Sequence, residues 1–212
     1  RFHLITLFPE ACEPYLSASI LGRAREAKKI SVDYQSPRDY VTNKWGKVDE
    51  RPYGGGPGMV MTALPVVTAV KKSLARRKGK IALVWFLPGG KEFDNAEAEK
   101  LSKFDDVVLV CGRYEGIDNR ALQLLKTFGT VKKYAVGQAT YTGGEIPALA
   151  IVDAVTRRIP GVLGKDESVE ERRTAAREVY TRPESILWEG KGYRVPKVLQ
   201  TGDHKKIEEW KN

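Results

Sequence analysis

Glycine-rich segments that follow apolar runs are the part of this sequence best suited to chemistry. Three occur in order, at 87–90, 111–116 and 137–145, and each comes directly after a run that predicts a β-strand. Ligands of open α/β sheets bind at the carboxyl ends of strands, and glycine lets backbone N–H groups approach a ligand closely. The segments predict a binding site on one edge of a sheet, although glycines also serve simple tight connections.

A fourth and denser glycine cluster, Tyr-Gly-Gly-Gly-Pro-Gly, occupies residues 53–58. It does not match the dinucleotide fingerprint G-x-G-x-x-G, and no Gly-Lys pair in the chain is followed by Ser or Thr, as a P-loop requires. Backbone N–H groups of such a loop suit ligand binding, and the same composition suits a wide turn. The sequence leaves both interpretations open.

Charge is a second feature with chemical meaning. Lys and Arg total 36 against 27 Asp and Glu, which gives a net charge of +9. This balance favours a polyanionic partner such as nucleic acid, and it also serves solubility. Arg157 and Arg158 follow an apolar helical stretch, where cations are favoured by the helix dipole whether or not they have a chemical role.

Several classes are excluded. His3 and His204 are the only histidines and Cys12 and Cys111 the only cysteines, so we expect no zinc site. Two isolated thiols fit a reducing cytoplasm. The longest apolar run, 81–87, is far too short to cross a bilayer, and the first residues lack the pattern of a signal peptide. We expect a cytoplasmic protein with no membrane partner and no metal site.

The elements that must position these loops follow from hydrophobic periodicity. Strands alternate with helices, which predicts an α/β fold with a mostly parallel sheet. The expected strands span 2–8, 30–35, 81–87, 107–111 and 134–136, and the expected helices span 15–28, 64–78, 93–103, 119–128 and 146–159.

A change in composition divides the chain. Residues 165–178 are almost entirely polar or charged, and a short tail with a final basic helix follows them. We therefore expect a main α/β domain at 1–162, a linker at 163–179 and a small helical C-terminal domain at 180–212.

Taken together, the motifs closely resemble the TrmD family of bacterial tRNA (guanine-N1)-methyltransferases. The resemblance runs nearly from end to end, and its longer motifs are highly specific. They lie at 7–10, 36–39, 49–59, 112–118, 142–148, 153–155, 157, 159–164 and 180–183.

The resemblance implies properties that composition does not show. The family belongs to the SPOUT class, in which a parallel α/β sheet carries a C-terminal trefoil knot. Its members are obligate homodimers with active sites shared between subunits. They move a methyl group from S-adenosylmethionine to N1 of guanosine 37 of tRNA, and Mg²⁺ takes part. No dedicated ligand cluster for that ion is visible in this sequence.

The same resemblance assigns roles to individual residues. Arg157 matches the family's catalytic arginine, and Glu115 matches an acidic residue near the donor and the target base. The positions that match donor-binding residues are Trp85, Phe86, Leu87, Pro88, Gly112, Tyr114, Glu115, Val136, Gly137, Gln138, Ala139, Thr140, Tyr141, Gly143, Gly144 and Pro147.

The sequence departs from the family pattern at 138–141 and in a slightly shorter linker. An ungapped count also places Arg172 where the family carries its catalytic Asp. A neutral guanine N1 is a poor nucleophile, so a general base there contributes about 10²–10⁴-fold, and an arginine cannot accept a proton. We expect Glu171 to act as the base, with Glu170 as its neighbour and alternative; a linker carboxylate without any role is equally compatible.

These departures leave rival hypotheses. One is a weakened or non-catalytic relative that binds donor and RNA. Another is a methyltransferase that acts on a different RNA position, because pocket shape sets the choice of base. Under each of them, basic residues of the linker and C-terminal helix are expected to bind phosphates.

Overall fold

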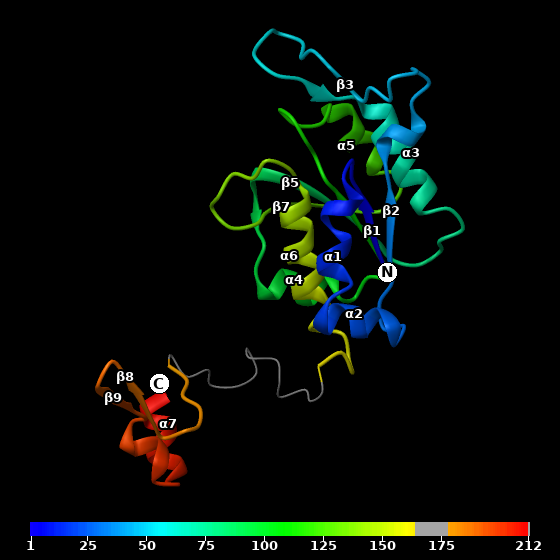
Figure 1. The fold of residues 1–212 in the computed structure, drawn as a ribbon. Helices are drawn as coiled ribbons and strands as arrows, with labels where there is room; N and C mark the ends of the chain where they lie inside the picture. The colour runs from blue at the N-terminus through cyan, green and yellow to red at the C-terminus, as the bar shows by residue number, and fades with distance from the viewer. Residues whose placement is uncertain (164–177, 212) are drawn as a thin grey trace. The chain divides into compact units, whose positions relative to one another are not determined.

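The computed structural model describes residues 1–163 and 178–211 of the 212-residue chain. The chain forms two compact units, Arg1–Val162 and Leu163–Asn212. Figure 1 shows the first unit in blue to yellow and the second in orange to red.

A five-stranded sheet forms the centre of the first unit. Its order is β2-β1-β6-β5-β7, and every neighbouring pair is parallel. This confirms the α/β fold with a parallel sheet that the sequence predicts. The strands are β1 (Phe2–Ile5), β2 (Val32–Gln35), β5 (Ile81–Glu92), β6 (Asp106–Val110) and β7 (Thr130–Ala135).

Helices cover both faces of this sheet (Figure 1). Alternate side chains of β6 show why: Val107 and Leu109 belong to one apolar core, and Val108 and Val110 belong to the other. The first core includes α1 (Glu13–Leu16), α2 (Ser19–Glu26), α4 (Asn95–Leu101) and α6 (Glu145–Thr156), and the second includes α3 (Ala63–Ser73) and α5 (Asn119–Leu125). In the described part of the chain, no helix has the length and apolarity needed to span a membrane.

The glycine cluster at 53–58 lies between two short strands that the sequence analysis did not expect. They are β3 (Asp49–Glu50) and β4 (Val60–Met61), and they pair antiparallel. The positive φ angles in the cluster explain its composition, because side chains disfavour that conformation; they occur at Gly54, Gly55, Gly56 and Gly58. Short 3₁₀ helices, η1 (Pro9–Ala11) and η2 (Pro37–Tyr40), complete this unit.

Several expected boundaries were wrong. The expected helix at 15–28 is broken into α1 and α2, and the strand expected at 134–136 begins at Thr130. This strand, β7, is at the edge of the sheet, where polar residues such as Lys132 and Lys133 are tolerated and conceal the apolar pattern. The strand expected to end at Leu87 continues as β5 to Glu92, because it resumes its pairing after an outward loop.

The second unit contains more than the helices expected of it. Strands β8 (Ser185–Trp188) and β9 (Lys191–Arg194) form an antiparallel hairpin. Glu189 and Gly190 between them both have positive φ, as a tight type I′ turn requires. The 3₁₀ helix η5 (Lys197–Gln200) and the basic helix α7 (His204–Lys211) follow.

Candidate functional site

Two of the predicted loops meet at the carboxyl edge of the sheet. The backbone N–H of Gly144 donates to the carbonyl oxygen of Gly112 at 2.9 Å. A Cβ added at Gly144 would lie 2.6 Å from the Cα of Cys111, so the contact requires glycine. The loop after β7 is therefore packed directly against the backbone that follows β6.

A buried ion pair joins this contact to the end of β1. Thr6 donates through Oγ1 to Oε1 of Glu145 at 2.7 Å, and Nη2 of Arg113 lies 3.0 Å from Oε2 of the same carboxylate. Thr6 is 0% exposed and Glu145 4%. The guanidinium of Arg113 also stacks over the ring of Phe8, 4.5 Å from its centroid. One carboxylate at the start of α6 thus links three strand ends, an arrangement not predicted from the sequence, although Phe8, Arg113 and Glu145 lie in its motifs.

The loop after β6 also contacts the glycine cluster. The N–H of Glu115 donates to the carbonyl of Met59 at 3.0 Å. A Cβ at Gly58 would lie 2.6 Å from Cγ of Glu115, so the bare glycine makes room for that side chain. Tyr114 adopts a left-handed φ of 58°, which is uncommon outside glycine. The glycine cluster at 53–58 therefore contacts Glu115, a residue of the candidate site, through its last glycine.

Strand β5 carries a bulge at 87–90, the loop at 87–90, which leaves the sheet and returns to it at one point. Phe86 and Lys91 both pair with Tyr134, so residues 87–90 protrude. Trp85, one residue before Phe86, is 8% exposed and belongs to the apolar core. Only its backbone is therefore available at the carboxyl edge of the sheet.

The predicted donor-binding residues follow these three strands and differ in exposure. Those open to solvent are Leu87, Pro88, Tyr114, Glu115, Gly137, Gln138, Ala139, Thr140 and Tyr141. Those half-buried are Phe86, Gly112, Val136 and Gly143, and those buried are Trp85, Gly144 and Pro147. Apart from Glu115, the structure thus presents an open surface of backbone and uncharged side chains around the Arg113–Glu145 ion pair.

Arg157 lies at the opposite end of α6 from this surface. It caps the C-terminus of the helix, whose 12 residues span about 18 Å. Beyond it, Gly161 lies close to the side chain of Lys29, which precedes β2, at the amino edge of the sheet. One chain by itself therefore does not bring Arg157 to the predicted donor loops. Glu170, Glu171 and Arg172 lie outside the described residues.

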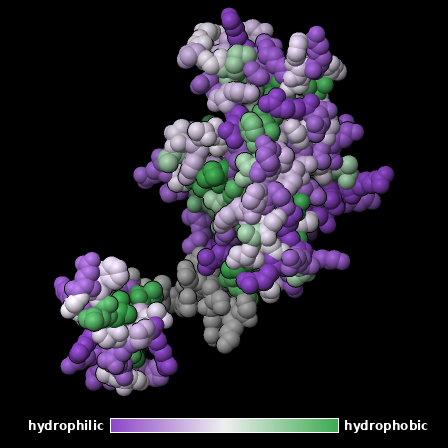
Figure 2. All heavy atoms as spheres, in the orientation of Figure 1, coloured by the Kyte–Doolittle hydropathy of each residue, from purple (hydrophilic) through white to green (hydrophobic). Residues whose placement is uncertain are grey.

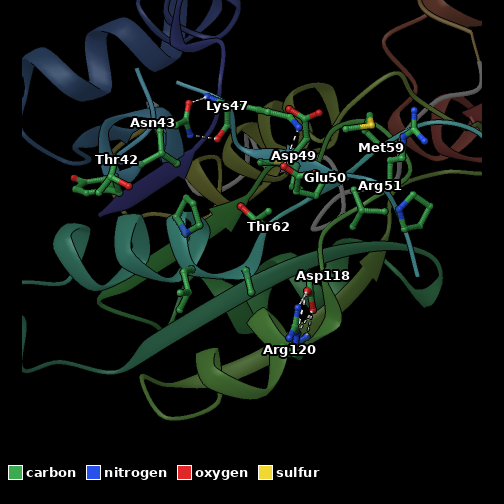
Figure 3. A pocket seen from close by; sticks show the side chains of 18 of the residues that line it. Thr42, Asn43, Lys47, Asp49, Glu50, Arg51, Met59, Thr62, Asp118 and Arg120 are labelled. Atoms are coloured by element: carbon green, nitrogen blue, oxygen red, sulfur yellow. Dashed lines mark hydrogen bonds and ion pairs between the residues drawn. The ribbon is translucent and has the colours of Figure 1, made fainter. Parts of the chain in front are cut away.

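A cavity of about 1560 Å³ opens beside β3 and β4 (Figure 3). It presents both charge signs: Lys47 pairs with Glu50 at 2.8 Å, and Nε of Arg120 donates to Asp118 at 3.0 Å. The bond from Arg120 lowers the pKa of Asp118. None of the predicted donor-binding residues lines this cavity. Its lining includes residues of two of the sequence motifs, 49–59 and 112–118.

The two thiols are unsuited to nucleophilic chemistry. Both cysteines are buried. Burial raises the pKa of Cys12 to about 11 and that of Cys111 well above its ordinary value. Among the described residues, no group of three or more His, Cys, Asp or Glu side chains is arranged to hold a metal ion.

The class of protein follows from this geometry. A fully parallel α/β sheet, with glycine-rich loops packed together at its carboxyl edge, is typical of enzymes that bind a small cofactor there. Because both thiols are buried, they are poor nucleophiles, which argues against covalent catalysis by cysteine.

Comparison with known proteins identifies the family. The chain matches the family described as "tRNA (Guanine-1)-methyltransferase TrmD" over residues 1–212. A tRNA (guanine-N(1)-)-methyltransferase of Clostridioides difficile is 40% identical, over the whole of this chain and 90% of the relative. One of Photobacterium profundum is 39% identical, over 98% of this chain and 82% of the relative. The chain belongs to the TrmD family of tRNA (guanine-1)-methyltransferases.

Proposed function

We propose that this protein uses S-adenosylmethionine to methylate N1 of guanosine 37 in tRNA. The family match over residues 1–212 carries the proposal. The net charge of +9 supports a nucleic-acid substrate.

The donor site of this proposal lies between the loops after β5, β6 and β7. Glycine-rich backbone at 137–144 supports it, since such backbone can hold an adenosine without charged side chains. Residues 136–141 carry no charge, which suits a cationic ligand, and Glu115 is the acidic group among the proposed donor-binding residues. When bound, S-adenosylmethionine supplies an electrophilic methyl group on a sulfonium.

The protein's own residues act on the target base. In this proposal Arg157 stabilises the negative charge that develops on O6 as N1 loses its proton. Glu171, or Glu170 beside it, accepts that proton, because Arg172 remains protonated. Glu115 orients the base next to the donor.

A second copy of the chain completes the site. Support comes from the separation within one chain, where the length of α6 lies between Arg157 and the donor loops. In the proposed homodimer, Arg157 of one copy serves the donor site of the other. Exposed apolar side chains suit a covering protein surface; they include Leu64, Leu124 and Ile146.

The second unit supplies tRNA contacts in this proposal. Trp188 on its hairpin is 66% exposed, and exposed aromatic rings serve as stacking surfaces for bases. Basic side chains available for phosphates include Lys191, Arg194, Lys205 and Lys206.

Two further features belong to the proposal. We infer a trefoil knot, supported by the passage of Gly144 against the backbone of Cys111 and Gly112. We also place the reaction in the cytoplasm, supported by the free, buried thiols of Cys12 and Cys111.

The deciding experiment is methylation of a tRNA transcript that carries guanosine at position 37. We expect 1-methylguanosine at that position after digestion and mass spectrometry, and none in a transcript with adenosine there. Methylation elsewhere would favour the alternative RNA position. Donor binding in calorimetry without any methylated product would favour the non-catalytic relative.

A further inference from the structure

A buried carboxylate on α4 lies beside the loop that leaves β5. Glu97 is 2% exposed. It accepts hydrogen bonds from Nζ of Lys91 at 2.6 Å, from Nζ of Lys100 at 2.6 Å and from the hydroxyl of Tyr134 at 2.7 Å. These bonds, with that from Lys100 the largest contribution, lower the pKa of Glu97 to about 2. The carboxylate is therefore charged at neutral pH.

Two of these donors mark the boundaries of predicted donor loops. Tyr134 is the point where the loop at 87–90 closes, because Phe86 and Lys91 both pair with it. Lys91 is the first residue after that loop. Tyr134 also lies two residues before Val136, where the loop after β7 begins. The carboxylate of Glu97 is thus bonded to Lys91, where the loop at 87–90 ends, and to Tyr134, just before the loop that begins at Val136.

The backbone of the loop at 87–90 is packed closely against Tyr134. A Cβ at Gly90 would lie 2.8 Å from the carbonyl carbon of Tyr134, so the loop at 87–90 is seated directly on β7. The ring of Phe93 packs edge-on against Tyr134, with centroids 5.4 Å apart. A shift of Tyr134 would therefore move the loop at 87–90 as well.

Helix capping does not account for these bonds. Glu97 is the third residue of α4, a position where glutamate often bonds back to the N-cap backbone. The cap itself is Asp94, whose Oδ1 accepts from the N–H of Glu97 at 2.8 Å. The carboxylate of Glu97 is directed inward, to Lys91, Lys100 and Tyr134. Its bonds connect the helix to β5 and β7.

We propose that Glu97 is a positioning residue for methyl-donor binding, acting through Lys91 and Tyr134 to fix the spacing between the loop at 87–90 and the loop that begins at Val136. The inference rests on the donor site proposed above. A ligand held by backbone groups requires those groups at fixed positions. Loosening them weakens donor binding, whereas the tRNA surface is unaffected.

The test combines donor calorimetry with methylation kinetics of the full-length chain. We expect Glu97→Gln to raise the Kd and the KM for S-adenosylmethionine roughly tenfold, with kcat at saturating donor and the KM for tRNA nearly unchanged. Tyr134→Phe removes one hydroxyl and should weaken donor binding in the same direction. The double variant should lose less than the sum, because the two residues share one interaction.

Two matched variants on the same helix separate positioning from stability. Asp94→Ala removes the cap of α4 but keeps the three donors of Glu97. Glu99→Gln changes an exposed acid that pairs with Lys103 at 3.7 Å. Both should bind the donor with the wild-type Kd, even where Asp94→Ala lowers the thermal midpoint.

The outcomes distinguish this inference from the proposed function. Wild-type donor affinity in Glu97→Gln, or an equal loss of affinity in Asp94→Ala, overturns the positioning role alone. A wild-type chain that does not bind S-adenosylmethionine at millimolar concentration overturns the proposed function, and the positioning role fails with it.

Discussion

Among individual residues, two glycines are informative because of the side chain that they lack. Gly144 and Gly58 each lie where a Cβ would come within 2.6 Å of another group, the Cα of Cys111 and the Cγ of Glu115 respectively. Cβ contacts this short do not occur in folded proteins, so each glycine records a close approach of two loops. Gly144 approaches the start of the loop at 112–118, and Gly58 approaches Glu115 within it.

Replacing Gly144 tests the first approach. We expect Gly144→Ala to weaken donor binding at least tenfold and to lower the free energy of unfolding by about 2 kcal/mol, because the backbone of Cys111 must shift. Calorimetry and urea unfolding measure the two effects. Gly192→Ala is the control, since no atom lies within 4 Å of its Cβ position. Equal stability of the two variants would contradict the close packing.

The proposed general base is tested at the same scale. We expect Glu171→Gln to lower kcat by about 10²–10⁴-fold with little change in donor affinity. The expected control is Glu170→Gln, with near wild-type kcat. The reverse result would assign the base to Glu170, and full activity in both variants would remove the linker carboxylates from the mechanism.

At the element scale, a buried polar cluster joins β1 to β6. Asp106 is 0% exposed and accepts hydrogen bonds from Nε of Arg1 at 2.9 Å and from Nε2 of His3 at 2.8 Å. Burial alone would raise the pKa of Asp106, but the bonds from Arg1 and His3 outweigh it and the pKa falls to about 2. Burial lowers the pKa of His3 below its ordinary 6.5, which favours the neutral imidazole.

The cluster predicts how stability depends on pH. Asp106 has a folded pKa below its ordinary 3.8, so its contribution is complete above pH 3.8 and is lost as the pH falls through about 2. His3, with a pKa below 6.5, adds an earlier loss of stability below pH 6.5. We therefore expect wild-type stability to fall in two stages on acidification, as measured by urea unfolding at several pH values.

Removal of the acid should change this profile. We expect Asp106→Asn to cost about 2 kcal/mol at pH 7, because it weakens the bonds from Arg1 and from the buried His3, and to abolish the stage between pH 3.8 and 2. Asp105→Asn is the control, since its side-chain oxygen still accepts from the N–H of Lys80. A profile of Asp106→Asn that matches the wild type would refute the assignment.

The elements also show which patterns are visible in a sequence. The buried strand β6 alternates between two cores and was predicted within one residue at each end. The edge strand β7 was found only in part, since Lys132 and Lys133 interrupt its apolar pattern. The hairpin of β8 and β9 was missed because Glu189-Gly190 is a weaker turn signal than Asn-Gly or Asp-Gly.

At the scale of the whole molecule, the separation of Arg157 from the donor loops predicts shared sites. Mixing Arg157→Ala with Glu115→Gln, each inactive alone, should restore activity after subunit exchange. Random pairing makes about half of all dimers heterodimers. In each heterodimer one of the two sites has both residues intact, so about a quarter of all sites should recover activity. Sedimentation of the wild type checks the dimer. No recovery in a mixture shown to contain heterodimers would mean that each chain forms its own site.

The α/β class can be read from the order of residues alone, because strands and helices alternate with distinct hydrophobic periods, and the family can be read from motifs that span the chain. Both signals lie in the order and spacing of residues along the chain, so they can be recognised without a structure. The tertiary structure decided the contacts between distant residues: Glu145 with Thr6 and Arg113, Glu97 with Tyr134, and Arg157 at the far end of α6. Such contacts depend on how the strands are ordered in the sheet, and hydrophobic periodicity carries no information about that order.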